Sequence, residues 1–123
     1  MKENLILFDD EFDKLKRKCP SFDDDFKRLK SVLLYDLNNG DNYLNPDRYH
    51  QIQGLKVRFS VFKIKKFRCK YIHKGNRSGF RFIFILSRKH KVIYFTECYF
   101  KGKKSNENRD RIKRVCLDFE EFI

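Results

Sequence analysis

Residues 80–99 read FRFIFILSRKHKVIYFTECY and predict a β-hairpin at the centre of a sheet. Residues 80–86 are apolar on both faces apart from Arg81, which is the pattern of a strand covered on both sides. Residues 87–91 make a tight basic turn, and residues 92–99 supply the second strand.

The chain before this hairpin is also β-like, but less regular. Residues 57–72 alternate between apolar and polar positions until the alternation slips near Val61 and Phe62, which predicts a bulge or a break into two strands. A turn with two glycines, residues 73–79, then leads into the hairpin. Residues 37–54 are rich in turn formers without a sustained period and predict a long loop, a kind of segment that is often functional or mobile.

Two helices are predicted near the N-terminus, on either side of Pro20. Asp9 or Asp10 can cap the first, which runs to about residue 18. Its apolar face holds Phe12, Leu15 and Cys19. Ser21 is the N-cap candidate for the second, which runs to about residue 36. A buried stripe on that helix consists of Phe22, Phe26, Leu29 and Leu33. Three acids in its first turn suit the helix dipole better than a metal site; they are Asp23, Asp24 and Asp25.

The remaining elements complete the predicted fold class. Residues 5–8 form a first strand, and residues 106–115 form a third helix with Ile112, Val115 and Cys116 inward. The order β-α-α-β-β-β-α predicts an α+β fold. We expect a small antiparallel sheet of three to four strands, with two N-terminal helices on one face and a short C-terminal helix. Residues 1–123 are predicted to form one domain.

Charge is the strongest compositional signal. Twenty-nine Lys and Arg residues stand against 17 Asp and Glu residues, a formal net charge of +12 over 123 residues. Between Lys56 and Lys104 the only acid is Glu97, so the surplus belongs to the middle of the chain. Such an imbalance usually serves a polyanionic partner, although a lysine-rich proteome is an alternative explanation. No apolar run is long enough for a membrane span, and the N-terminus turns acidic too soon for a signal peptide, so we expect a cytoplasmic protein.

The cysteines and histidines show no metal-ligand spacing. The four cysteines, Cys19, Cys69, Cys98 and Cys116, lie far apart with no C-x-x-C pair. We therefore expect them to be free, buried or half-buried thiols, and we expect no structural metal and no cofactor.

Arg81 requires an explanation, because a buried charge is costly unless it is paired. One explanation is a structural pair with Glu97 on the neighbouring strand. The other places Arg81 at the floor of a basic cleft, with Tyr99 at the end of the adjoining strand. The lysines and arginines expected to line that cleft are Lys70, Lys74, Arg77, Lys101, Lys103 and Lys104. Clustered cations with an aromatic neighbour suit phosphate binding and base stacking.

Three stretches carry a resemblance to a known family. They are residues 62–70 (FKIKKFRCK), residues 75–84 (GNRSGFRFIF) and residues 93–104, which end in Lys101-Gly102-Lys103-Lys104. With the helix pair before the sheet, this pattern resembles the RelE/ParE toxin superfamily of bacterial type II toxin–antitoxin systems. The most specific points are Ser-Gly-aromatic-Arg opening the central strand and the aromatic-Lys-Gly-Lys-Lys loop after the last strand.

The resemblance implies roles for particular residues. Members of the RelE branch are metal-independent ribonucleases that cut mRNA, usually on the ribosome. By this resemblance Arg81 stabilises the reacting phosphate, Lys101 is a second catalytic cation, and Tyr99 is the match for a catalytic Tyr or His. Lys74 is assigned to catalysis as well, and RNA binding is assigned to Arg68, Lys70, Arg77, Lys103 and Lys104. The C-terminal tyrosine of the founding members is missing, since no Tyr follows Tyr99.

The residue types suit this chemistry. RNA supplies its own 2′-hydroxyl nucleophile, so charge stabilisation and proton transfer suffice, and Arg81 would act electrostatically. Crowding by other cations favours the neutral form of a lysine, which makes Lys70, Lys74 or Lys101 possible proton-transfer groups. We expect an mRNA endonuclease toxin that acts on mRNA and the ribosome and is masked by a cognate antitoxin. A ParE-like gyrase inhibitor and a non-enzymatic RNA- or ribosome-binding module are the alternatives.

Overall fold

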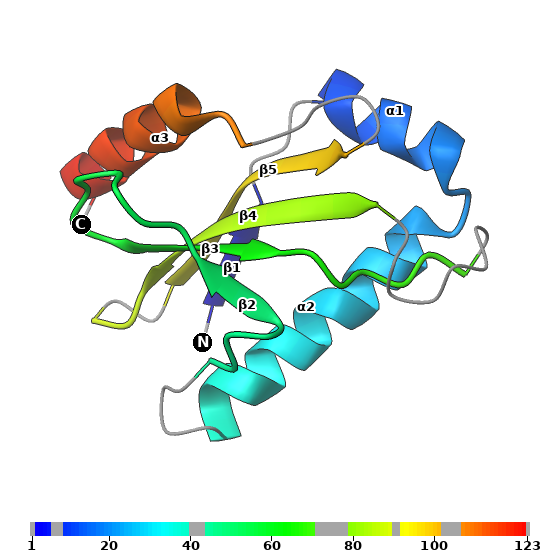
Figure 1. Ribbon diagram of the computed structural model, residues 1–123, viewed down its shortest axis with the longest axis horizontal. Helices are drawn as coiled ribbons and strands as arrows, with labels where there is room; N and C mark the ends of the chain where they lie inside the picture. The colour runs from blue at the N-terminus through cyan, green and yellow to red at the C-terminus, as the bar shows by residue number, and fades with distance from the viewer. Residues whose placement is uncertain are drawn as a thin grey trace.

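The computed structural model describes residues 2–5, 9–39, 44–70, 79–89, 92–101 and 107–122 (Figure 1). Three helices and five strands follow one another along the chain. They are β1 (Lys2–Leu5), α1 (Asp9–Lys18), α2 (Phe22–Asn39), β2 (Tyr49–Gln51), β3 (Ser60–Ile64), β4 (Phe80–Ser87), β5 (Val92–Phe100) and α3 (Arg109–Phe122). The α+β class is confirmed, with two helices before the main strands and one after them. None of the described helices is long and apolar enough to cross a membrane.

The strands form one sheet in the order β1-β5-β4-β3-β2. Strands β2 to β5 are antiparallel to their neighbours, as expected, whereas β1 adds to the edge of β5 in parallel. The sequence predicts the first strand at residues 5–8. It begins at Lys2 instead, and residues 6–8 lie outside the described part of the chain. Its sequence, KENL, has none of the β-branched or aromatic residues that favour strands. The strand forms by pairing with the backbone of β5.

The long loop expected at residues 37–54 contains a short strand. β2 pairs with β3, and its Tyr49 is only 2% exposed. The Tyr49 ring meets Phe84 edge-on at 6.2 Å, and its hydroxyl donates a hydrogen bond to Asp36 of α2. Burial, reinforced by this bond to the carboxylate, raises the pKa of the Tyr49 phenol. A short strand with one buried aromatic residue thus lies within a segment whose composition favours turns.

The expected hairpin is confirmed as β4 and β5, with one irregularity in register. Arg81 lies opposite Tyr99 and Ile83 opposite Glu97, but Phe84 lies opposite Phe95. Thr96 is therefore the extra residue of a β-bulge, and its side chain is fully buried. The slip near Val61 and Phe62 is not a bulge. Both side chains are buried, on opposite faces, because helices cover the sheet on both sides.

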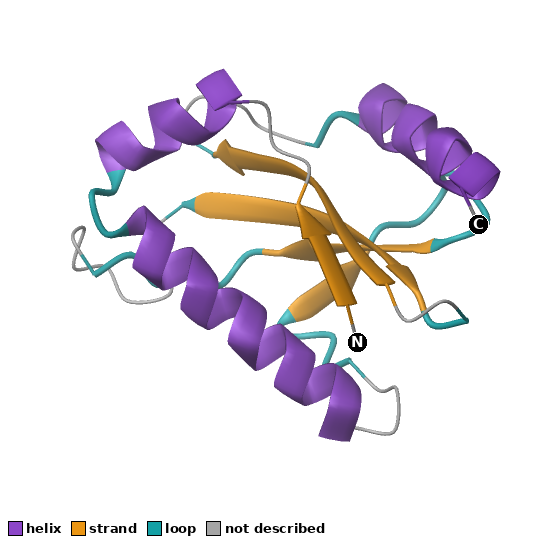
Figure 2. Ribbon diagram, turned by 180° about the vertical axis from the view of Figure 1, so that it is seen from behind, coloured by secondary structure: helices purple, strands orange, loops and turns teal. Residues whose placement is uncertain are grey.

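Helices lie on both sides of the sheet (Figure 2). The sheet separates two apolar clusters, one on each face. One lies beneath α1 and α2 and is dominated by phenylalanine. It includes Phe22, Phe26, Phe67, Phe80, Phe82, Phe84 and Phe95. The other lies beneath α3 and is smaller. It includes Leu55, Val61, Ile83, Ile85, Ile112 and Cys116. The inward positions expected for the helices are confirmed for Leu15, Cys19, Ile112 and Cys116, while the side chain of Phe12 lies outside the described part.

The expectation of four free thiols is wrong for one pair. Cys19, between α1 and α2, forms a disulfide with Cys69, which follows β3, with a Cα–Cα distance of 6.4 Å. Fifty residues separate the two cysteines in sequence, so only tertiary packing brings them together. Cys98 and Cys116 are free buried thiols, as expected.

Candidate functional site

Arg81 lies near the start of β4, on the sheet face that α3 covers further along. Its side chain is partly buried, and its Nη1 donates hydrogen bonds to the carbonyl oxygens of Lys65 (3.1 Å) and Phe80 (3.2 Å). No carboxylate among the described residues forms an ion pair with it. The structure therefore does not support a structural pair with Glu97. Because a guanidinium carries five N–H donors, some of them stay available to a ligand.

Glu97 has a different partner. Its side chain is 1% exposed, and Oε1 accepts the backbone N–H of Asn108 at 3.0 Å. Asn108 in turn caps α3, because its Oδ1 accepts the N–H of Arg111 at 3.1 Å. Glu97 thus connects β5 to the start of α3 through a hydrogen bond with the backbone of Asn108.

Tyr99 lies directly opposite Arg81 and is 7% exposed. Burial, with the charges of Glu107 and Glu97, raises the pKa of its phenol to about 12, although Arg81 acts in the opposite direction. The hydroxyl therefore carries its proton at neutral pH. In chemistry at this site it is equipped to donate a proton or a hydrogen bond rather than to act as a base.

Lys63 and Glu107 form a pair that the sequence analysis missed. Lys63 lies on β3 opposite Ile83 of β4, and its Nζ is 2.7 Å from Oε2 of Glu107. The two side chains are only 12% and 4% exposed. Burial favours the neutral acid, but Lys63 and Arg109 outweigh it and lower the pKa of Glu107, which therefore stays ionised. Strand alternation places Lys63 on the same face as Val61. Nothing in the sequence indicates that Lys63 pairs with Glu107, because the two residues lie far apart along the chain.

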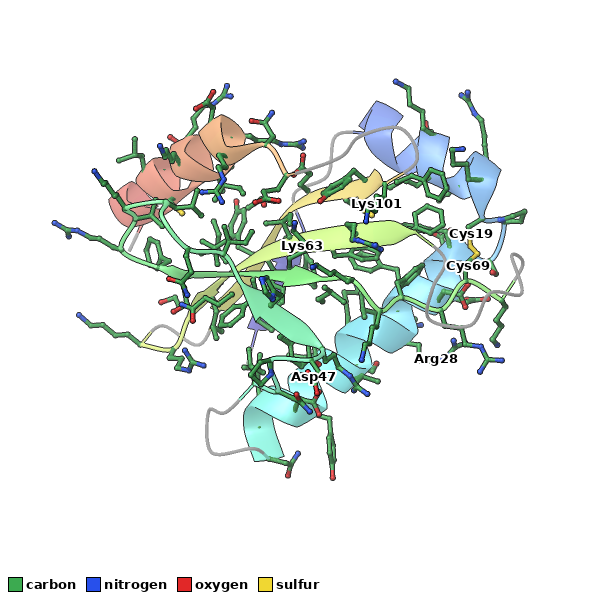
Figure 3. All side chains as sticks on the ribbon, in the orientation of Figure 1. Cys19, Arg28, Asp47, Lys63, Cys69 and Lys101 are labelled. Atoms are coloured by element: carbon green, nitrogen blue, oxygen red, sulfur yellow. A yellow bond between two sulfur atoms is a disulfide. The ribbon has the colours of Figure 1, made fainter. Side chains whose placement is uncertain are left out.

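Lys101 lies at the open end of the hairpin. Its backbone N–H donates to the carbonyl of Gly79 at 2.9 Å, and its side chain is exposed. Gly79 has a φ of +94°, and a Cβ there would lie 2.8 Å from the ring of Phe100, so a side chain would be doubly unfavourable. Figure 3 shows Lys63 and Lys101 on one face of the sheet. Strand register and alternation place Arg81, Tyr99, Lys63 and Lys101 on the same face of the sheet, and we call these four residues the hairpin site.

The other predicted site residues divide into two groups. Lys74, Arg77, Lys103 and Lys104 lie outside the described residues. Arg68 and Lys70 are exposed and flank the disulfide residue Cys69. Arg68 lines a cavity against α2, on the opposite side of the sheet from Tyr99, so it does not join the hairpin site.

One group of side chains in the described ranges has donor atoms suited to a metal ion. These are Cys19, Asp25 and Cys69, whose donor atoms all lie within 4.8 Å of one another. Two of the three are sulfur atoms joined in the disulfide, so they are not thiolate ligands in this state. Asp25 Oδ2 accepts hydrogen bonds from Ser21 Oγ (2.6 Å) and from the backbone N–H of Lys70 (3.1 Å). Asp25 therefore connects α2 to the residue that follows Cys69. The sequence predicts only an interaction of Asp25 with the helix dipole.

No protein-family model, curated protein or solved structure matches this chain.

Proposed function

We propose that this protein is the toxin of a type II toxin–antitoxin system, a RelE-like, metal-independent endoribonuclease that cuts mRNA on the ribosome. The observation that carries the proposal is the pairing of Arg81 with Tyr99 across β4 and β5. The pair combines a permanent cation that no described carboxylate neutralises with a phenol that holds its proton. Lys101 lies at the end of the same hairpin.

The proposed reaction uses the 2′-hydroxyl of the RNA as nucleophile. As its oxygen attacks the adjacent phosphorus, the hydroxyl proton passes to a solvent water and the bond to the 5′-oxygen breaks. The products are a 2′,3′-cyclic phosphate and a 5′-hydroxyl end. Arg81 and Lys101 stabilise the extra negative charge on the phosphate in the transition state. Tyr99 donates its proton to the leaving 5′-oxygen and is reprotonated from water.

The decisive test is RNA cleavage by Arg81→Ala. We expect activity to fall at least about 10²-fold, because one preorganised cation at the reacting phosphate is removed. Stability is expected to stay nearly unchanged, since Arg81 bonds only to carbonyl oxygens within the described structure. Arg114→Ala is the matched control, because it removes the same charge from the exposed surface of α3.

The assay uses purified protein, mRNA and translating ribosomes, with and without EDTA, and product ends are mapped. Cleavage that survives EDTA and fails in Arg81→Ala supports the proposal. An Arg81→Ala variant with full activity per folded molecule contradicts it. An intact message together with inhibited DNA supercoiling would favour a ParE-like gyrase inhibitor instead.

A non-enzymatic RNA- or ribosome-binding module is the second candidate. It is favoured by the low exposure of Tyr99 and by the two acids near it, Glu97 and Glu107, which repel phosphate. In that case Lys101 and the neighbouring cations contact phosphates only, and binding weakens steeply with salt without any cleavage.

A cognate antitoxin is part of the proposal. An acidic, partly disordered chain would complement the +12 surface and block access to RNA. Expression of the toxin alone in a bacterium is expected to arrest growth. Unimpaired growth with an unmutated gene would count against this partner.

A further inference from the structure

A second cationic site lies away from the hairpin site, between α2 and the segment that follows β3. It is a cavity of about 190 Å³. Four of its lining residues are cations: Arg28 from α2, Arg48, Lys66 and Arg68. Its apolar lining consists of Leu29 and Val32 of α2 and the buried ring of Phe67. Figure 3 shows Arg28 on the flank of the molecule that carries the disulfide.

The charge of this cavity is strongly unbalanced. Its one carboxylate, Asp25, already accepts hydrogen bonds from Ser21 and from the Lys70 backbone, and Arg28 Nη1 lies 3.3 Å from its Oδ1. Arg48 reaches Asp36 only at 3.6 Å. Within the described ranges, no carboxylate forms an ion pair with Lys66 or Arg68. The cavity therefore presents N–H donors that have not been used, with a surplus of positive charge.

The wall that carries Lys66 and Arg68 is held rigidly. Between them, Phe67 is 1% exposed and packs on Phe82 with ring centroids 4.8 Å apart. The next residue, Cys69, is tied to Cys19 by the disulfide, and Lys70 N–H is bound by Asp25. The backbone that carries these two exposed cations is thus anchored at the buried residue between them. Preorganisation of this kind reduces the entropic cost of binding a ligand.

We propose that this cavity binds a phosphate monoester with a small apolar group beside the phosphate. Arginine forks match phosphate oxygens in geometry and charge. A monoester carries about −1.5 to −2 charges at neutral pH, whereas a diester carries one, and only a monoester exposes three free oxygens. The volume is below the roughly 300 Å³ at which sites for whole drug-sized ligands begin, so the cavity holds the phosphate end of a ligand. This proposal does not require that the hairpin site cleaves RNA.

Calorimetric titration tests this site, with phenyl phosphate, 5′-AMP and dimethyl phosphate as probes. We expect one monoester bound per chain and a much weaker diester. Arg68→Gln and Lys66→Gln should each weaken the monoester about tenfold, as expected for loss of a charge-assisted contact. Val32→Phe removes no charge but fills the cavity, and it should abolish binding. Arg114→Gln on α3 is the matched control and should leave affinity within about twofold.

Each outcome bears on the proposal. Tighter 5′-AMP than phenyl phosphate would assign the apolar group to a nucleotide, and the reverse order to a small phosphorylated metabolite. Equal weakening by Arg68→Gln and Arg114→Gln, with no effect of Val32→Phe, would mean diffuse attraction to a basic surface and would overturn the site. Absence of saturable monoester binding by the folded wild-type protein would overturn it as well. RNA cleavage lost in Arg81→Ala but kept in Val32→Phe would separate this site from the hairpin site.

Discussion

Beneath α1 and α2 the sheet is covered by stacked phenylalanine rings, whereas beneath α3 it buries a mixture of aliphatic side chains, a tyrosine and charged groups. The rings of Phe26 and Phe82 are nearly parallel at 5.0 Å, and Phe22 stacks on Phe82 at 6.0 Å. On the other face, Glu97 and the Lys63–Glu107 pair lie beside Ile83 and Tyr99. Apolar contacts stabilise a fold without directional demands, while buried charges must be paired and are costly to disturb. The α1/α2 face is therefore predominantly apolar, and the α3 face carries the buried Lys63–Glu107 pair, Glu97 and the residues of the proposed hairpin site.

The largest expected effect is on the α1/α2 face. Phe82→Ala should destabilise the protein by about 3–5 kcal/mol, because it removes a fully buried ring and leaves a cavity. Chemical denaturation monitored by circular dichroism measures the change. A loss below about 1 kcal/mol would mean that this face collapses around the gap and is less closely packed than its ring contacts indicate.

Removal of the disulfide comes next. The double variant Cys19→Ser/Cys69→Ser should lose about 4 kcal/mol, since the bridge closes a loop of about 50 residues in the unfolded chain. The wild-type protein should lose a comparable amount in reductant, and the double variant should be insensitive to it. Equal stability of the oxidised and reduced wild-type protein would show that the bridge does not contribute to the α1/α2 face.

On the α3 face, the Lys63–Glu107 pair should show the cost of an unpaired charge. Lys63→Met should destabilise the fold by about 3 kcal/mol, because Glu107 is then left with little water and a weaker partner. Lys63→Met/Glu107→Leu should recover much of that loss, since neither charge remains. Additive losses in the double variant would mean that the two groups act independently.

The same pair predicts a pH dependence. Because the pKa of Glu107 is lowered in the folded state, its contribution to stability is present above the unfolded pKa near 4.5 and is lost as the pH falls through the folded pKa. Thermal melts between pH 2 and pH 7 should show this acid-dependent loss in the wild-type protein. The loss should be smaller in Lys63→Met, whose stability varies less over the same range.

The smallest effect concerns the Tyr99 phenol. Its folded pKa of about 12 exceeds the usual 10.0, so its contribution to stability is present below pH 10 and is lost as the pH rises toward 12. Ultraviolet titration of tyrosinate should show one fewer late-titrating phenol in Tyr99→Phe than in wild type. A difference spectrum centred near pH 10 would mean that the Tyr99 phenol is exposed to water, and it would contradict the burial described here.

Much of the fold was predictable because its signals are local. The four-three-four spacing of Phe22, Phe26, Leu29 and Leu33 defines the buried face of α2, and Pro20 separates the two helices. The apolar run after Arg81 indicates a strand covered on both faces, which β4 is. For the proposed hairpin site, the motif that opens β4 predicts Arg81, and the end of β5, with Tyr99 and Lys101, lies beside the start of β4.

Other features were decided by tertiary structure alone, because they join groups that have no local relation in sequence. The parallel edge of β1 depends on hydrogen bonds offered by β5, not on the residues of KENL. The disulfide, the Lys63–Glu107 pair and the cavity between Arg28 and Arg68 each unite side chains tens of residues apart. Periodicity records which face of an element is buried, and it carries no information on which distant residue will cover it.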